Sequence, residues 1–246
     1  MAQNVYANGS ASKEIFVKSG GSWVPVKGVW VKDGGVWRQC FPAASSTQSY
    51  TTAGTYSFTV PNGIYSLTTT VVGAGGGGGG FYGNGDSHAG GAGGSGGFYT
   101  GQSISVTPGE TLTVVVGAGG GSASVEFNGV FKCTGTAYGT TGTYWNGKAG
   151  ASTTISRGAT VLYTATGGQP GIGSGPGDNC SGSSGAGGSP SGVAGGVINC
   201  NRNSYTATQG GDNGTGYGKG GNGNSLVSGV WGCSQVGGDG AVVFSW

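Results

Sequence analysis

Acidic, histidine and cysteine side chains are the groups in this sequence that could do acid–base, nucleophilic or metal chemistry. The chain has one histidine, His88, and no serine or cysteine nucleophile comes with a G-x-S-x-G context between a strand and a helix. A glycosidase would need two carboxylates flanking the scissile bond, and the spacing of the acids does not single out such a pair. The acids that fall in glycine-rich stretches are Asp86, Asp178, Asp212 and Asp239. We therefore expect no enzymatic activity.

The cysteines show no metal-binding spacing. None of the five forms a C-x-x-C pair, and with a single histidine zinc is disfavoured, so we expect no metal and no cofactor. The N-terminus lacks a charged segment followed by an apolar one, which predicts synthesis in a cytoplasm without a signal peptide. That compartment favours free or buried thiols. Oxidation after release from the cell is the alternative, with Cys180 and Cys200 as the pair to test.

Aromatic and polar side chains set among glycines are better candidates for binding than for catalysis. Binding loops are rich in Tyr, Ser, Gly and Asn, because these residues combine rigid contact area with adaptable hydrogen bonding. Phe81, Phe98 and Trp231 are the ones that could equally fill gaps beneath such loops. The candidate binding residues are Tyr82, His88, Tyr99, Tyr138, Tyr144, Trp145, Arg202, Tyr205 and Tyr217.

These candidates are positioned by strands that run directly into glycine. Glycine supplies 62 of 246 residues, which disfavours helices. The stretch Tyr65–Gly80 (YSLTTTVVGAGGGGGG) starts with strand-forming residues and ends in glycine, and Thr111–Gly121 repeats the string VVGAGG. Thr160–Gly173 follows the same pattern. The sequence therefore predicts an all-β fold built on such strands.

Turn signals predict an antiparallel β-sandwich over residues 50–246. Thr107-Pro108-Gly109-Glu110 has proline and glycine where a type II turn needs them, and Asn128-Gly129 is the favoured type I′ dipeptide. The expected strands are Tyr56–Val60, Tyr65–Val72, Ser103–Val106, Thr111–Val116, Val125–Phe127, Val130–Cys133, Thr153–Ser156, Thr160–Ala165 and Ala241–Trp246. Because the tight turns alternate with the glycine stretches, we expect the long loops 73–101, 117–122 and 166–240 to gather at one end.

The glycine loops are expected to be ordered by their backbone. A free Gly/Ser linker would be a coil, and fixing each residue costs about 1–2 kcal/mol. Polyproline II segments can lie close together where side chains are absent, and hydrogen bonds between them contribute roughly 1 kcal/mol each. We predict such a packing of polyproline II segments.

Residues 1–40 form a separate module, joined to the sandwich by a linker at 41–49. IFVKSGGSW (Ile15–Trp23) and VWVKDGGVW (Val29–Trp37) are two copies of a hairpin with a Gly-Gly turn. Isolated hairpins are marginal in water, so their tryptophans should pack on each other or on another protein. The candidate attachment residues are Trp23, Trp30 and Trp37.

Composition excludes several classes of protein. The net charge is +2 and charged residues make up 7% of the chain, without the basic stripe of a nucleic-acid-binding protein. The sequence contains no run of about 18 apolar residues, so we expect no transmembrane helix.

The hairpin repeat (VKSGGSWVPVKGVWVKDGGVW), FTVPNGIYSLTTTVVGAGGGGGG, TPGETLTVVVGAGGG and the ending GGDGAVVFSW resemble segments of bacteriophage tail proteins. Over about residues 15–246 the sequence is similar to the glycine-rich distal domains of tail fibres and to the tip adhesins of T-even-like phages. The resemblance implies a virion protein that binds other tail proteins through its hairpins. Its glycine-rich loops would bind a bacterial outer-membrane protein or surface glycan. A homotrimer would be consistent with the resemblance.

Other functions are open at this stage. A structural tail component that contacts only other virion proteins is the main alternative. An ice-binding protein would need a flat threonine or alanine array, whereas only short runs such as Thr68–Thr70 occur. A polysaccharide depolymerase is the least supported.

Overall fold

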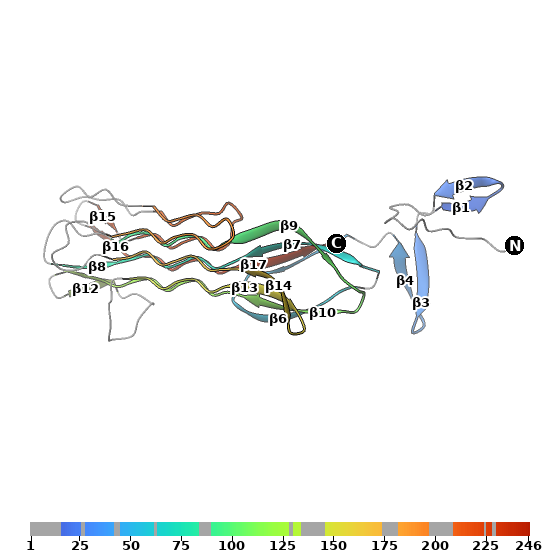
Figure 1. Cartoon of the computed structure of the whole chain (residues 1–246), viewed down its shortest axis with the longest axis horizontal. Coiled ribbons are helices and arrows are strands. Elements are labelled where there is room, and N and C mark those ends of the chain that lie inside the picture. Colours follow the sequence, from blue (N-terminus) through green and yellow to red (C-terminus); the bar gives the residue numbers. More distant parts are fainter. Residues whose placement is uncertain are drawn as a thin grey trace.

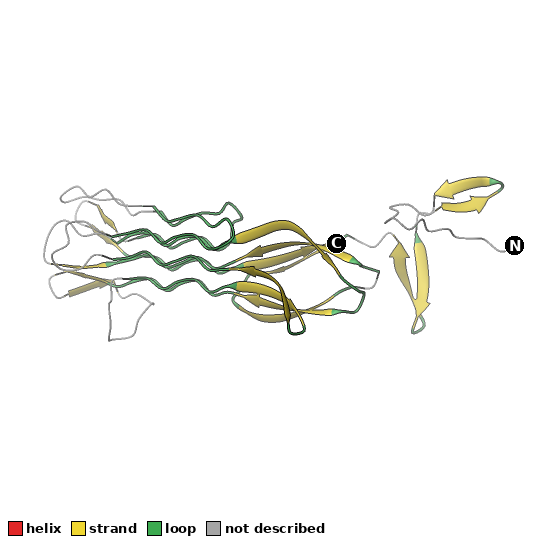
Figure 2. Cartoon of the chain, in the orientation of Figure 1, coloured by secondary structure: helices red, strands yellow, loops and turns green. Residues whose placement is uncertain are grey.

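The fold is all-β, as the sequence predicts. In the computed structural model no helix occurs among the residues that the structure describes (Figure 2). The described residues are 16–25, 28–41, 45–61, 63–83, 90–127, 130–133, 146–173, 182–196, 209–223, 225–227 and 230–246.

Two β-hairpins precede the sandwich. The first pairs β1 (Phe16–Ser19) with β2 (Ser22–Pro25), and the second pairs β3 (Val29–Asp33) with β4 (Val36–Phe41). Both glycines of each Gly-Gly turn have positive φ, from 56° to 87°. Such a turn matches the twist of paired strands and favours glycine at both central positions, which explains why the repeat conserves this dipeptide in both of its copies.

The body is a sandwich of two four-stranded antiparallel sheets. One sheet has the order β5-β17-β7-β9 and the other β14-β13-β10-β6. The strands of the first are β5 (Thr47–Tyr50), β17 (Ala241–Ser245), β7 (Ser66–Val72) and β9 (Phe98–Ser105). Those of the second are β14 (Thr160–Ala165), β13 (Thr153–Arg157), β10 (Thr111–Val116) and β6 (Gly54–Thr59).

Alternating side chains of both sheets fill the core. In β7, Leu67, Thr69 and Val71 are buried while Ser66, Thr68 and Thr70 are more exposed, as period-two patterning requires. Phe244 of β17 is also fully buried and stacks on Phe58 of β6, with ring centroids 4.4 Å apart. These contacts join the two sheets.

Tight turns lie at one end of the sandwich and glycine segments leave from the other. Gly109 has φ of 80° and the Glu110 N–H donates to the Thr107 carbonyl, as the predicted type II turn requires. Ser46 and Trp246 exchange backbone hydrogen bonds at the same end. We call this the proximal end. In Figure 1 the glycine-rich part extends from the opposite side of the sandwich.

Three expectations about strand positions are corrected. β9 begins at Phe98 rather than Ser103, so residues 98–101 belong to the sandwich and not to a loop. β5 begins within the expected linker 41–49 and pairs with the C-terminal strand. The hairpin of β11 (Val125–Phe127) and β12 (Val130–Cys133) lies at the far end of the glycine-rich part, not in the sandwich (Figure 1).

We expect Phe244→Ala to lower the free energy of unfolding by about 3–5 kcal/mol, because it removes a buried ring that contacts both sheets and leaves a cavity. Tyr65→Ala is the matched control, since that ring is 68% exposed and its loss should change stability by no more than about 0.5 kcal/mol. Urea unfolding of both variants measures the difference. Equal losses would contradict this description of the core.

Candidate functional site

The glycine-rich part is a bundle of extended segments that run side by side along the long axis of the molecule (Figure 1). Successive segments alternate in direction, away from the sandwich and back, as their hydrogen-bond registers show. The segments are 73–80, 90–97, 117–124, 146–152, 166–173, 182–189, 192–196, 209–212, 218–223 and 233–240. We refer to them together as the glycine bundle.

Segment 73–80 is the centre of the glycine bundle, and its N–H groups follow a period of three residues. Every third N–H donates to the same neighbouring segment. The donor–acceptor pairs, at N···O distances of 2.8–3.1 Å, are Gly73–Gly97, Gly76–Gly94 and Gly79–Gly91, then Ala74–Ala151 and Gly77–Lys148, then Gly75–Gly238 and Gly78–Gln235. Polyproline II has three residues per turn, so the predicted polyproline II packing is confirmed here.

The carbonyl groups of the same segment accept hydrogen bonds from other neighbours. Gly168 and Gly171 donate to it from one segment, Gly120 and Ala123 from a second, and Gly221 from a third. Segment 73–80 thus donates to three segments and accepts from three others. All of its residues are buried, so it occupies the position that a hydrophobic core holds in other domains.

The close spacing excludes side chains at most central positions. A Cβ added to Gly77 would lie 2.0 Å from the carbonyl oxygen of Gly121, and one added to Gly75 would lie 2.0 Å from that of Lys219. These are backbone atoms that cannot rotate away. The six consecutive glycines from Gly75 to Gly80 are therefore a steric requirement and not a flexible linker.

A few side chains replace backbone partners at the base of the glycine bundle. Asp239 accepts hydrogen bonds from Gly119 N (2.8 Å) and from Ala53 N (3.1 Å) in the loop between β5 and β6. The buried Thr153 hydroxyl accepts from Gly117 N at 3.0 Å. These contacts connect the glycine bundle to the sandwich.

Other polar side chains form hydrogen bonds with backbone groups within the glycine bundle. The fully buried Ser95 hydroxyl accepts from Val193 N at 2.8 Å, and Ser234 donates to the Ala123 carbonyl at 2.6 Å. The side-chain amide oxygens of Asn146 and Asn222 accept from backbone N–H groups, each at 2.8–2.9 Å. Several polar residues of the glycine-rich stretches are thus structural.

Five stretches of the sequence connect neighbouring segments at the distal end of the glycine bundle. We call 81–89, 125–145, 174–181, 197–208 and 224–232 the distal tips. They include two small sheets: β8 (Phe81–Gly83) pairs in parallel with β11, which pairs with β12, and β15 (Ser225–Val227) pairs with β16 (Val230–Gly232). The strands β8, β12, β15 and β16, which are far apart in sequence, therefore share one end of the glycine bundle (Figure 1).

Most candidate binding residues belong to the distal tips. Tyr82 lies in β8. His88, Tyr138, Tyr144, Trp145, Arg202 and Tyr205 belong to the tips by sequence but lie outside the described residues.

Two candidates lie elsewhere. Tyr99 is in β9 of the sandwich, where its ring contacts that of Tyr163 with centroids 5.3 Å apart at the margin of the core. Tyr217 lies in the turn 213–217 at the sandwich end of the glycine bundle, where its N–H donates to the Thr215 hydroxyl. The structure therefore does not bring these two together with the distal tips.

The tryptophans of the hairpins are largely exposed. Trp23, Trp30 and Trp37 have exposed fractions of 52%, 56% and 63%. Each hairpin places a lysine opposite a tryptophan: Lys18 pairs with Trp23 and Lys32 pairs with Trp37. The hairpins thus carry a large apolar surface for their size.

Cys233 forms a disulfide bond, so the expectation of free thiols fails at this residue. It stands at the distal end of segment 233–240, directly after β16. Cys180 and Cys200, the pair to test for oxidation, lie outside the described residues.

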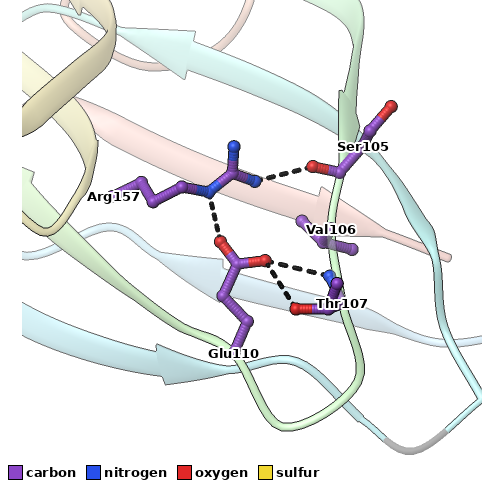
Figure 3. Close-up of a pocket in the computed structure, with 5 residues that line it drawn as sticks. All are labelled: Ser105, Val106, Thr107, Glu110 and Arg157. Atoms are coloured by element: carbon purple, nitrogen blue, oxygen red, sulfur yellow. Dashed lines mark hydrogen bonds and ion pairs between the residues drawn. The ribbon is translucent and has the colours of Figure 1, made fainter.

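A shallow pocket at the proximal end is the other candidate site (Figure 3). Arg157 pairs with Glu110 through Nε and donates from Nη2 to the Ser105 carbonyl at 2.6 Å. The second Glu110 oxygen accepts from Thr107 N at 2.9 Å. The Arg157 hydrogen bond, followed by that of Thr107, lowers the pKa of Glu110. Because these polar groups are hydrogen-bonded to one another, they connect the turn 107–110 to the end of β13 at Arg157.

Within the described part of the chain, no group of His, Cys, Asp and Glu could hold a metal ion. No membrane-spanning helix occurs there either.

Comparison with known proteins identifies a family. A family model described as a glycine-rich domain matches residues 51–246. The chain belongs to this glycine-rich domain family. The match covers the glycine bundle and all of the sandwich except β5, and it leaves out the hairpins. No protein of curated function matches the sequence.

We expect Gly77→Ala to lower the stability of the glycine-rich domain by at least about 3 kcal/mol or to prevent folding, because the new Cβ would overlap a backbone carbonyl. Gly238→Ala is the control in the same bundle, since its Cβ would have 3.3 Å to the nearest atom. That variant should lose no more than about 1 kcal/mol. Thermal unfolding followed by circular dichroism measures both, and a Gly77→Ala protein as stable as the control would contradict the bundle packing.

We also expect Glu110→Gln to destabilise the protein at neutral pH but not in acid. The lowered pKa of Glu110 means that its stabilising effect is present above the unfolded-state pKa of about 4.3 and disappears as pH falls through the lower folded-state value. The effect should stay below about 1 kcal/mol because Arg157 is 44% exposed. Urea midpoints of both proteins from pH 7 to pH 2 test this. A difference that persists unchanged at the lowest pH would contradict it.

Proposed function

We propose that this protein is a bacteriophage tail-fibre or tail-tip adhesin that binds a bacterial surface receptor through its distal tips. The receptor would be an outer-membrane protein or a surface glycan. The observation that carries the proposal is the rigid glycine bundle, which gathers stretches far apart in sequence at one end of the molecule.

The positions of the two ends of the molecule support a receptor site at the distal tips and attachment at the proximal end. The chain passes into the sandwich at Ser46 and ends at Trp246, and these residues are hydrogen-bonded to each other at the proximal end. The strands β8, β12, β15 and β16, which belong to the distal tips, lie at the other end of the glycine bundle (Figure 1). A partner that holds the protein near Ser46 would leave the tips free to contact a cell.

The order of the glycine bundle supports binding, since a site whose supporting backbone is already fixed loses less conformational entropy when it binds. The backbone hydrogen bonds of segment 73–80 and its neighbours fix both ends of each tip. The tips contain Tyr82, Tyr144 and Tyr205, whose large rings can contribute binding energy with few rotatable bonds. The same geometry would serve a protein or a glycan receptor.

The hairpins are the proposed attachment to other tail proteins. Trp23, Trp30 and Trp37 are more than half exposed, and exposed apolar surface of this kind marks interaction sites. In this proposal the protein is assembled in the host cytoplasm and acts as part of the virion.

The described acids favour binding over sugar hydrolysis. Asp212 forms an ion pair with Lys219 and accepts from Gly214 N at 2.9 Å, while both Asp239 oxygens accept backbone hydrogen bonds. Glu110 is paired with Arg157. These carboxylates act as structural acceptors, and we propose that the protein has no enzymatic activity.

The decisive experiment measures binding of the purified, fluorescently labelled full chain to a panel of Gram-negative cells. We expect saturable binding to some strains. A variant with Tyr82→Ala, Tyr144→Ala and Tyr205→Ala should bind at least about tenfold more weakly. Tyr65→Ala and Tyr99→Ala, both in or beside the sandwich, are matched controls and should bind as the unmodified protein does.

Two outcomes would contradict the proposal. If the unmodified protein binds no strain in the panel, a purely structural role in the tail is favoured. If the triple variant is folded and binds with unchanged affinity, those tip residues do not form the receptor site. Release of sugar from capsule or lipopolysaccharide during incubation would instead indicate an enzyme.

A further inference from the structure

The two hairpins carry the same three-residue pattern on their first strands. Residues 16–18 of β1 are Phe-Val-Lys, and residues 30–32 of β3 are Trp-Val-Lys. The aromatic residue and the lysine are two positions apart, so their side chains share one face of the hairpin. A tryptophan of the second strand lies opposite each lysine, Trp23 in the first hairpin and Trp37 in the second. The hairpins therefore present the same combination of aromatic rings and a lysine twice.

The hairpin module is the basic part of the chain. Residues 1–40 contain five basic and two acidic residues, whereas residues 41–246 contain five basic and six acidic ones. Lys18 and Lys32 are both exposed. In the described part of the chain neither hairpin packs against the sheets of the sandwich (Figure 1). The positive charge of this face is thus not neutralised by the sandwich.

The two lysines also stand where the backbone faces outward. Each hairpin is a separate two-stranded sheet among the described residues, so both of its strands are edge strands. Ser19 pairs with Ser22 across the first two-residue turn, and such a pair is hydrogen-bonded. Hydrogen-bonded and non-hydrogen-bonded pairs alternate along an antiparallel ladder. The next pair in each hairpin contains Lys18 or Lys32, so the N–H and C=O groups of these lysines point toward the open edge.

We propose that β1 and β3 each bind a strand of an acidic partner polypeptide along this open edge. The added strand pairs its backbone with the outward N–H and C=O groups, which makes each hairpin a three-stranded sheet. A glutamate or aspartate of the partner lies opposite Lys18 or Lys32, and apolar residues lie opposite the valine and the aromatic residue. This inference rests on the proposed function, in which the hairpins attach to another tail protein, and it specifies the chemistry of that partner.

The lysines favour an acidic partner over a second copy of this chain. Pairing of β1 or β3 with the same strands of another copy would bring lysines together, and like charges on neighbouring strands destabilise a sheet. Lysine on an edge strand is a common protection against such self-association. The same charge attracts carboxylates. A third strand would also stabilise the hairpins, since isolated two-stranded sheets are marginal in water.

Fluorescence anisotropy with labelled synthetic peptides tests the proposal on the full chain. The probe is a short peptide with blocked ends and a Glu-Val-Leu triplet between threonines, which matches residues 16–18 or 30–32 in the antiparallel direction. We expect saturable binding of this peptide. A peptide with lysine in place of glutamate should bind at least about tenfold more weakly, because it brings like charges together.

A third peptide separates strand addition from a simple charge contact. It keeps the glutamate, but alternate amides are N-methylated, so it cannot form the hydrogen bonds of an added strand. It should also bind at least about tenfold more weakly than the probe. If the probe does not bind, or if either control peptide binds equally well, the proposal is overturned.

Charge reversal on the protein gives a complementary test. Lys18→Glu combined with Lys32→Glu should reverse the preference, so that the lysine peptide binds better than the glutamate peptide. Lys148→Glu combined with Lys219→Glu makes the same change in net charge at exposed lysines of the glycine bundle, and it should keep the original preference. The same effect in both double variants would overturn the proposal. If a variant does not fold, the three peptides still decide the question on the unmodified chain.

Two further measurements separate this inference from its alternatives. Light scattering of the full chain tests self-association, and a discrete oligomer that dissociates after Trp30→Ala and Trp37→Ala would place a second copy on the hairpins and overturn the proposal. The cell-binding assay tests the distal tips alone. If the probe peptide binds but no bacterial strain does, the receptor role fails and the acidic partner is retained. If cells are bound but the peptide is not, the acidic partner is rejected and the receptor role is retained.

Discussion

Direct contact between backbones is the constraint on which this structure depends. The neighbours of segment 73–80 lie so close that a Cβ at Gly77 would overlap the Gly121 carbonyl. That proximity allows hydrogen bonds in every radial direction, because a polyproline II helix turns its N–H groups outward every third residue. Each bond contributes only about 1 kcal/mol, so the stability of the glycine bundle comes from their number and from the sandwich that aligns the segments.

The sandwich and the glycine bundle stabilise each other through shared strands. β7, β10 and β14 continue without interruption into segments 73–80, 117–124 and 166–173, so the sheet register sets where each segment begins. Asp239 reinforces this junction, since its carboxylate accepts from the N–H groups of both Gly119 and Ala53. A rotation of the bundle on the sandwich would break these bonds together.

Much of the fold could be predicted from the sequence because its signals are local. The Gly-Gly turns identify the hairpins, and the Pro108-Gly109 turn identifies the proximal end. The strands that end in VVGAGG identify the start of two segments of the glycine bundle. Segment 146–152 was missed because NGKAGAS contains only two glycines, although Gly147 and Gly150 keep the period of three. The position of Tyr99 was missed because the Gly101 at the middle of β9 suggested a loop. Placement of Asp239 between two N–H groups depends on distant contacts that no local pattern encodes.

The order of β17 in its sheet has a consequence for biosynthesis. This last strand lies between β5 and β7, and the segment before it supplies acceptors to Gly75 and Gly78 at the centre of the bundle. Until β17 and this segment have been synthesised, the sheet and the glycine bundle each lack a central element and cannot close. Such dependence on non-local pairing makes folding slow and exposes unpaired strands meanwhile.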